Sequence, residues 1–237
     1  MRVDIQPVET WASRVADLWT SRLLDQPTLR MCLATGATPV PVYAEMGRRV
    51  AAGAVSFARA TVFVLDEWLG LPPGHEVRCD SMLQRDLLAH VDLDPGRVHT
   101  FDVDDGDPAA ECRTYDAAIR DGGLDLAILG LGRNGHLGMN EPGTVFDAPT
   151  RIVELAEETR LGAARYGELA TSPTHGVTVG LGPIGDAAEV WLLVRGAEKA
   201  GILSRVLEGP VGPDIPATRL RLHPRGLVLA DADAVSS

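Results

Sequence analysis

The chain has 237 residues, of which 45% are hydrophobic, so it is long enough to bury a substantial core. Its 33 acidic and 22 basic residues give a net charge of −11, which argues against nucleic acid or an anionic membrane as a partner. No window approaches about 18 consecutive apolar residues, and the N-terminus lacks a secretory signal. Three widely spaced cysteines suggest neither a disulfide framework nor a zinc site. We therefore expect a cytoplasmic protein with a single domain over residues 1–237.

Helix-like and strand-like segments alternate along the whole chain. In order, the apolar spacing predicts a helix at 9–24, a strand at 29–34, a helix at 39–52, a strand at 61–65, a helix at 79–89, a short strand at 98–101, a helix at 108–121, a strand at 124–131, a helix at 158–165, strands at 176–181 and 188–194, a helix at 197–207 and a strand at 226–230. This order predicts an α/β fold with a Rossmann-like open, mostly parallel sheet and helices on both faces.

The strand at 29–34 runs into Thr35-Gly36-Ala37-Thr38-Pro39. Thr38 is a good N-cap and Pro39 a good first residue for the following helix. The free N–H groups at that helix start, its dipole and the two threonine hydroxyls suit a phosphate group. The segment matches neither a Walker A loop nor a dinucleotide fingerprint. Taken alone, an ordinary capped turn explains it equally well.

Two adjacent carboxylates, Asp66 and Glu67, follow the strand at 61–65. If the backbone stays extended there, they point to opposite faces, so that one can enter a site while the other binds elsewhere. Without further context, such a pair is more typical of a solvated turn.

The loop at 130–143 contains several glycines together with Asn134, His136, Asn140 and Glu141, directly after the strand at 124–131. Ligands of open α/β sheets bind at the carboxyl ends of strands, and a histidine near a carboxylate can transfer protons near neutral pH. A glycine-rich turn with a histidine bonded to backbone is the simpler alternative. The density of polar groups that no turn requires favours a functional site.

With these segments, the chain resembles the glucosamine-6-phosphate deaminase family, within the wider group that also contains 6-phosphogluconolactonases. The resemblance covers nearly the whole chain, and the segments that carry it are 34–39, 65–71, 110–115, 130–144, 159–161, 164–166, 178–180, 199–200 and 222–223. The most specific signal is the loop, because the lactonase branch typically has Asp-Gly-His without a following Asn-Glu-Pro. Asn140-Glu141-Pro142 therefore favours the deaminase branch.

The resemblance implies conversion of glucosamine 6-phosphate to fructose 6-phosphate and ammonia, with no cofactor and no metal. His136 would open the sugar ring, Glu141 would hydrogen-bond His136, and Asp66 would carry the C2 proton to C1. Asn134 would belong to the same catalytic group. Long-chain members of the family have Asp at its position and short-chain members have Asn, so negative charge beside His136 must come from Glu141.

The resemblance also implies a phosphate site made of Thr35, Gly36, Ala37, Thr38, Arg165 and Lys199. Ala37 stands where the family usually has a second glycine, which is tolerable only if its φ stays negative. Residues 76–80 replace a Ser-Tyr pair that is common in the family. We expect substrate preference to depend on this segment.

Several alternatives to glucosamine-6-phosphate deamination stay open at this point. They are hydrolysis of 6-phosphogluconolactone, deamination of galactosamine 6-phosphate, and sugar-phosphate sensing without catalysis. A sensor would be expected to lose Asp66 or His136 and to carry a DNA-binding module. This sequence keeps both residues and has no segment long enough for such a module at either end. The chain ends a few residues after the last predicted strand, as in short-chain members, so the resemblance implies a monomer or small oligomer.

Overall fold

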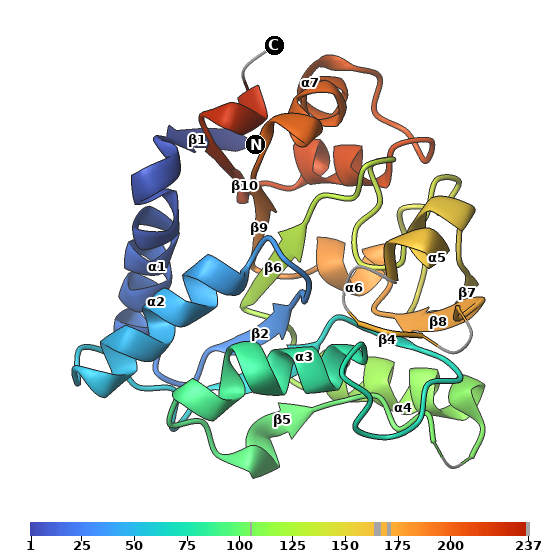
Figure 1. Ribbon diagram of the computed structural model, residues 1–237, viewed down its shortest axis with the longest axis horizontal. Helices are drawn as coiled ribbons and strands as arrows, with labels where there is room; N and C mark the ends of the chain where they lie inside the picture. Colours follow the sequence, from blue (N-terminus) through green and yellow to red (C-terminus); the bar gives the residue numbers. More distant parts are fainter. Residues whose placement is uncertain (105, 164–166, 170–171, 236–237) are drawn as a thin grey trace.

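The computed structural model describes residues 1–104, 106–163, 167–169 and 172–235, and a seven-stranded parallel sheet forms its centre (Figure 1). The strand order across the sheet is β1-β10-β9-β6-β2-β3-β5, and every neighbouring pair is parallel. The strands are β1 (Arg2–Gln6), β2 (Arg30–Leu33), β3 (Thr61–Val64), β5 (Val98–His99), β6 (Leu126–Gly130), β9 (Glu189–Val194) and β10 (Gly226–Asp231).

Helices cover both faces of this sheet, as the alternation predicts. One face packs against α1 (Val8–Asp25), α2 (Val40–Ala51) and α3 (Cys79–Asp86), and the other against α4 (Pro108–Arg120), α6 (Leu181–Gly185) and α7 (Ala200–Glu208). Neighbouring strand residues alternate between the two layers, so Met31 joins the cluster of Trp19, whereas Cys32 joins that of Ile119. The predicted fold class is confirmed.

A second, smaller sheet stands at one end of the first. It has the antiparallel order β4-β8-β7 and consists of β4 (Asp66–Trp68), β7 (Arg151–Glu154) and β8 (His175–Thr178). The chain enters it directly from β3 through Leu65. Asp66 is therefore the first residue after the change of sheet, and it pairs with Thr178.

The structure differs from the predicted elements in several places. Four elements, β1, β4, β7 and α6, are not predicted from the sequence, and some predicted strands have other boundaries. The strand predicted at 98–101 has only two residues, and the one predicted at 176–181 ends at Thr178. Short 3-10 segments occur at Leu88–His90, Pro95–Arg97, Ala197–Lys199, Pro216–Leu222 and Asp233–Val235, and α5 spans Glu157–Ala163.

Thr38 is not the cap of the following helix. Helix α2 begins at Val40, Pro39 occupies the N-cap position with φ −76° and ψ −15°, and no side chain caps the helix. The turn over 37–39 adds a residue before the helix, which leaves the Thr38 hydroxyl on the wall of a cavity.

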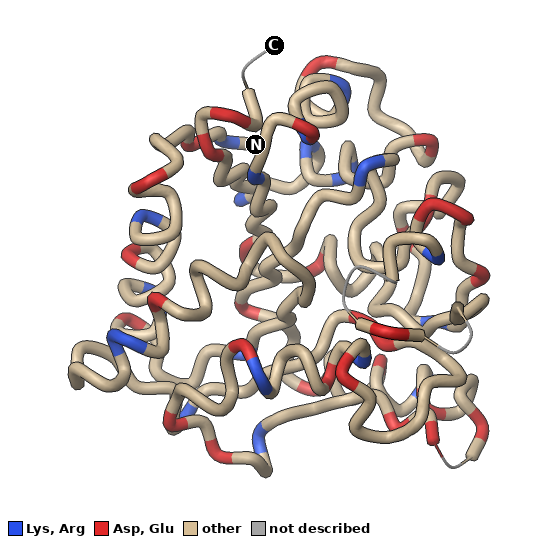
Figure 2. Tube along the Cα trace, viewed as in Figure 1, with Lys and Arg blue, Asp and Glu red and all other residues tan. Residues whose placement is uncertain are grey.

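Basic and acidic residues are interspersed along the chain (Figure 2). In the described ranges, every helix is too short or too polar to span a bilayer.

The strand order places a topological switch point at the centre of the main sheet. From β2 the chain moves to β3 on one side, whereas from β6 it moves to β9 and then β10 on the other. The loops that follow β2 and β6 therefore diverge and leave a crevice at the carboxyl ends of these strands, where open α/β sheets bind ligands.

Candidate active site

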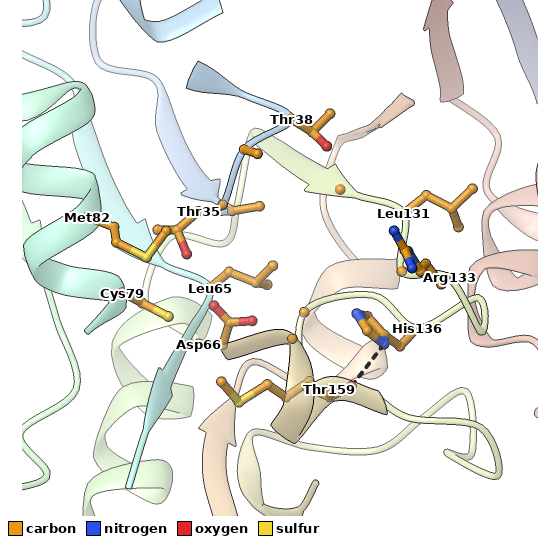
Figure 3. Close-up of a pocket in the computed structure, with 18 of the residues that line it drawn as sticks. Thr35, Thr38, Leu65, Asp66, Cys79, Met82, Leu131, Arg133, His136 and Thr159 are labelled. Atoms are coloured by element: carbon orange, nitrogen blue, oxygen red, sulfur yellow. Dashed lines mark hydrogen bonds between the residues drawn. The ribbon is translucent and has the colours of Figure 1, made fainter. Parts of the chain in front are cut away.

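A cavity of about 200 Å³ occupies this crevice (Figure 3). Its walls come from the loop after β2, from the β3–β4 junction, from α3, from the loop after β6, and from α5. The lining includes Thr35, Gly36, Ala37, Thr38, Asp66, Trp68, Cys79, Met82, Arg133, His136, Met139, Glu158, Thr159, Gly162 and Lys199.

The loop after β2 forms an anion cradle on one wall. Gly36 has φ +93°, a conformation that only glycine adopts readily, and it turns the chain toward α2. Within the described ranges, the backbone N–H groups of Gly36, Ala37 and Thr38 meet no acceptor. Every described residue with positive φ is a glycine, so Ala37 fits the loop without strain. The cradle can therefore donate several hydrogen bonds to one anion.

Lys199 brings a positive charge to the same cavity. Its Nζ donates to the carbonyl oxygen of Leu131 at 2.7 Å, which holds the ammonium group against the loop after β6. Arg165, the other predicted phosphate ligand, lies outside the described residues.

Asp66 lies on the wall of the cavity and is only 8% exposed. Burial raises the pKa of this carboxyl group to about 6, although the Cys79 thiol and the charge of His136 act in the opposite direction. Near neutral pH the group is thus ionised but close to its pKa, which suits a general base.

Glu67 points away from the cavity. Its carboxylate accepts hydrogen bonds from the backbone N–H groups of Trp68, Cys79 and Asp80 at 2.7–3.0 Å, and it lies 3.7 Å from the Arg78 Nε. The predicted division of the two carboxylates between opposite faces is confirmed. The alternative interpretation of Asp66 and Glu67 as part of a solvated turn is wrong, because β4 pairs with β8 and both side chains are buried. Glu67 instead satisfies the first N–H groups of α3.

His136 faces Asp66 from the opposite wall (Figure 3). Its Nδ1 lies 3.4 Å from Oε2 of Glu141, and Asn134 Nδ2 donates to the same oxygen at 2.9 Å. The Asn134 Oδ1 accepts the backbone N–H of His136 at 3.1 Å. Burial acts to raise the pKa of Glu141, but hydrogen bonds from His136, Thr159 and Asn134 and the charge of His136 lower it to about 2.

The loop itself is held rigidly around His136. A Cβ on Gly132 would lie 2.3 Å from the imidazole Cδ2, so only glycine fits beside the ring. Asn140 is fully buried and donates to the carbonyl oxygens of Leu137 and Val179, while its Oδ1 accepts from Arg151 at 2.8 Å. The Asn140 side chain therefore ties the loop to the end of β8.

The structure thus brings most of the predicted site residues together. Asn134 and Glu141 are exceptions in one respect, because they stand behind His136 and do not line the cavity. Within the described ranges, no group of three His, Cys, Asp or Glu side chains is arranged to hold a metal ion.

Sequence reasoning missed two polar residues of the site. Thr159 lies on α5 and reaches both Glu141 and His136; its sequence segment carries the resemblance, but nothing in the sequence shows which residues it contacts. Arg133 lies on the cavity wall and, within the described ranges, makes no ion pair or hydrogen bond. A cation inside the glycine-rich loop is the signal that could have identified it.

The arrangement can move protons on a small anion. A buried carboxylate and an imidazole face each other, and a second carboxylate supports the imidazole. Backbone N–H groups of the loop after β2 and the ammonium group of Lys199 also line the cavity and can bind an anion.

Comparison with known proteins agrees with this chemistry. The sequence pattern of the family described as glucosamine-6-phosphate isomerases/6-phosphogluconolactonase matches residues 6–229. The glucosamine-6-phosphate deaminase of Pseudarthrobacter chlorophenolicus is 42% identical over 94% of this chain and 86% of the relative. That of Hahella chejuensis is 40% identical over 100% of this chain and 91% of the relative.

Solved structures give the same result. A monomeric glucosamine-6-phosphate deaminase superposes with a TM-score of 0.95 at 33% identity, covering 99% of this chain and 98% of that one. A 6-phosphogluconolactonase from Thermotoga maritima has a TM-score of 0.77 at 20% identity over 97% of this chain and 99% of its own, which shows a shared fold. The chain therefore belongs to the family of glucosamine-6-phosphate isomerases and 6-phosphogluconolactonases.

Proposed function

We propose that this enzyme is a glucosamine-6-phosphate deaminase, which converts glucosamine 6-phosphate and water to fructose 6-phosphate and ammonia. The relatives at about 40% identity over nearly the whole chain carry this name. The observation in the site that carries the proposal is Asp66, a buried carboxylate with a raised pKa opposite His136. An aldose–ketose isomerisation needs such a base, whereas hydrolysis of a lactone does not.

His136 opens the pyranose ring. Its Nδ1 lies near Glu141, so Nε2 is the nitrogen left for the substrate. Nε2 takes the proton of the anomeric hydroxyl and returns a proton to the ring oxygen, which breaks the C1–O5 bond and gives the open-chain aldehyde. The Glu141 carboxylate stabilises the imidazolium that forms between these two transfers.

Asp66 then performs the isomerisation. It removes the proton from C2 of the open-chain sugar, which gives an enolamine, and returns the proton to C1. The product is an iminium group at C2. Water adds to C2, and the resulting carbinolamine expels ammonia and leaves the ketone of fructose 6-phosphate. The base acts only in the transition state, so its removal affects turnover more than binding.

The anion cradle holds the phosphate. Thr35, Gly36, Ala37, Thr38 and Lys199 all line the cavity. Their backbone N–H groups, hydroxyls and ammonium group are donors suited to phosphate oxygens. We extend the same role to Arg165 on the family resemblance alone.

The decisive experiment offers the purified enzyme three substrates in parallel. Ammonia and fructose 6-phosphate are measured with glucosamine 6-phosphate, ammonia with galactosamine 6-phosphate, and acid release with 6-phosphogluconolactone. We expect ammonia from glucosamine 6-phosphate, and loss of that activity in Asp66→Asn. Lactone hydrolysis without ammonia release would refute the deaminase, and release from the galactose epimer alone would correct the substrate.

We further propose that the enzyme works in the cytoplasm as a monomer. The solved relative at 33% identity is itself described as monomeric, and all three cysteines here are free and buried. Light scattering tests the assembly, and a hexamer would refute it.

A further inference from the structure

We propose that Thr159 is a positioning residue for ring opening: its hydroxyl fixes the Glu141 carboxylate and thereby the tautomer of His136. The link to ring opening rests on the proposed function, whereas the tautomer can be observed without substrate. This assignment makes α5 part of the catalytic centre rather than only a wall of the cavity.

The contacts form a small closed network. Thr159 Oγ1 donates to Oε1 of Glu141 at 2.5 Å and lies 3.5 Å from Nδ1 of His136. The other carboxylate oxygen, Oε2, lies 3.4 Å from the same Nδ1 and accepts from Asn134 at 2.9 Å. One oxygen is therefore held from α5 and the other from the loop after β6.

Counting protons decides the tautomer. A carboxylate only accepts, so the single hydroxyl proton of Thr159 is used on Glu141. The lone pairs of the hydroxyl then remain for Nδ1. Both groups around Nδ1 are thus acceptors, and the neutral imidazole satisfies them only with its proton on Nδ1. Nε2 is left bare toward the cavity, where ring opening needs a base.

Removing the hydroxyl has two consequences. Within the described residues, Oε1 of Glu141 loses the hydrogen bond from Thr159, and the carboxylate is then held only through Oε2, by Asn134 and His136. Nδ1 also loses one of its two acceptors. The preference for a proton on Nδ1 weakens as a result, and part of the population carries it on Nε2, where it blocks the base.

The position of Thr159 explains why α5 is involved. Glu158, Thr159 and Gly162 of this helix all line the cavity, while Ala163 is fully buried and Leu161 is 66% exposed. The helix thus faces the cavity with one side, and Thr159 is its contact with the catalytic pair.

The test compares Thr159→Val, which keeps the shape but removes the hydroxyl, with Thr159→Ser, which keeps the hydroxyl. Thr159→Ala is a second deletion in case the valine variant folds poorly. Thr114→Val is the matched control, because the Thr114 hydroxyl binds only the carbonyl oxygen of Ala110 on the exposed side of α4.

The readout is the ¹⁵N spectrum of histidine-labelled enzyme at alkaline pH, in which the two neutral tautomers differ, with His136→Gln to assign the signal. We expect His136 to carry its proton on Nδ1 in the wild type, in Thr159→Ser and in Thr114→Val. In Thr159→Val and Thr159→Ala we expect a mixture. The kcat of the deletions should fall about 10- to 100-fold with little change in KM, as for a lost hydrogen bond to a charged group.

An unchanged His136 tautomer in both deletions would overturn the proposal, whatever the rates. So would a loss of kcat that Thr159→Ser fails to restore. If the wild type releases no ammonia but the tautomer still responds to Thr159, the proposed function fails and the positioning role stands. If ammonia is released and the tautomer does not respond, only the positioning role fails.

Discussion

Replacing Asp66 by Asn should make the enzyme inactive and, at neutral pH, more stable. Burial raises the pKa of Asp66 to about 6 from its usual value of 3.8. At about 1.4 kcal/mol for each tenfold change in proton affinity, keeping Asp66 ionised costs the fold about 3 kcal/mol. Asn has nearly the same shape and carries no charge, so it removes most of this cost.

The sign follows from proton binding. Between the unfolded pKa near 3.8 and the folded pKa near 6, the folded state binds more protons than the unfolded state. The free energy of unfolding therefore falls as pH rises through this window, and the penalty is complete above it. The stability gained by Asp66→Asn should therefore grow as pH rises through this window, be complete above it, and vanish near pH 4.

Thermal unfolding of both proteins at about pH 7.5 and about pH 4 measures the effect. For a chain of this size about 3 kcal/mol corresponds to roughly 6–12 °C in Tm at the higher pH. Turnover should fall at least about 10³-fold, because the general base is lost.

Asp92→Asn is the control with the opposite sign. Burial acts to raise the pKa of Asp92, but hydrogen bonds from Ser56 and from the backbone N–H of Phe57 leave it lowered. Its replacement should therefore destabilise at neutral pH. An Asp66→Asn protein that melts at or below the wild type at pH 7.5, or a gain that is the same at both pH values, would refute the reasoning.

Three further predictions concern the site and its support. The pH profile of kcat/KM should have an acid limb with an apparent pKa near 6, since protonated Asp66 cannot accept the C2 proton; a profile flat down to pH 5 contradicts this. Lys199→Met should raise KM about 10- to 100-fold, and Arg133→Gln should raise KM less, because both cations line the cavity and can bind the anionic substrate. Initial-rate kinetics should show little change in kcat for either variant, and a fall in kcat instead would contradict this role. Arg78→Leu should lower the free energy of unfolding by about 3–5 kcal/mol, because it leaves Glu67 buried without its cation; a loss below about 1 kcal/mol in urea titration would contradict that.

Long periodic segments are the part of the fold that the sequence predicts well. The apolar stripe of α1 and the runs of β2 and β6 are recognised because each buries its residues against partners of the same kind, whatever the details. Strand β1 is missed because its pattern is mostly exposed, and it exists only through pairing with β10, more than two hundred residues away. Strands β4 and β7 have three and four residues and also depend on a distant partner.

The meeting of the site loops also follows from the sequence. Alternating strands and helices imply a parallel sheet, and a parallel sheet brings the ends of its strands to one edge. The residues after β2, β3 and β6, among them Asp66 and His136, can therefore be expected in one crevice.

Only the tertiary structure decides what each side chain does within that crevice. Thr38 lines the cavity instead of capping α2, Glu67 turns away to hold α3, and Thr159 reaches Glu141. These outcomes depend on hydrogen bonds of about 3 Å. Such a bond forms or is lost when a turn is one residue longer or when a helix moves by about one ångström. Sequence spacing determines which segments bury their apolar faces, but it contains no information at that resolution about partners that the fold brings together.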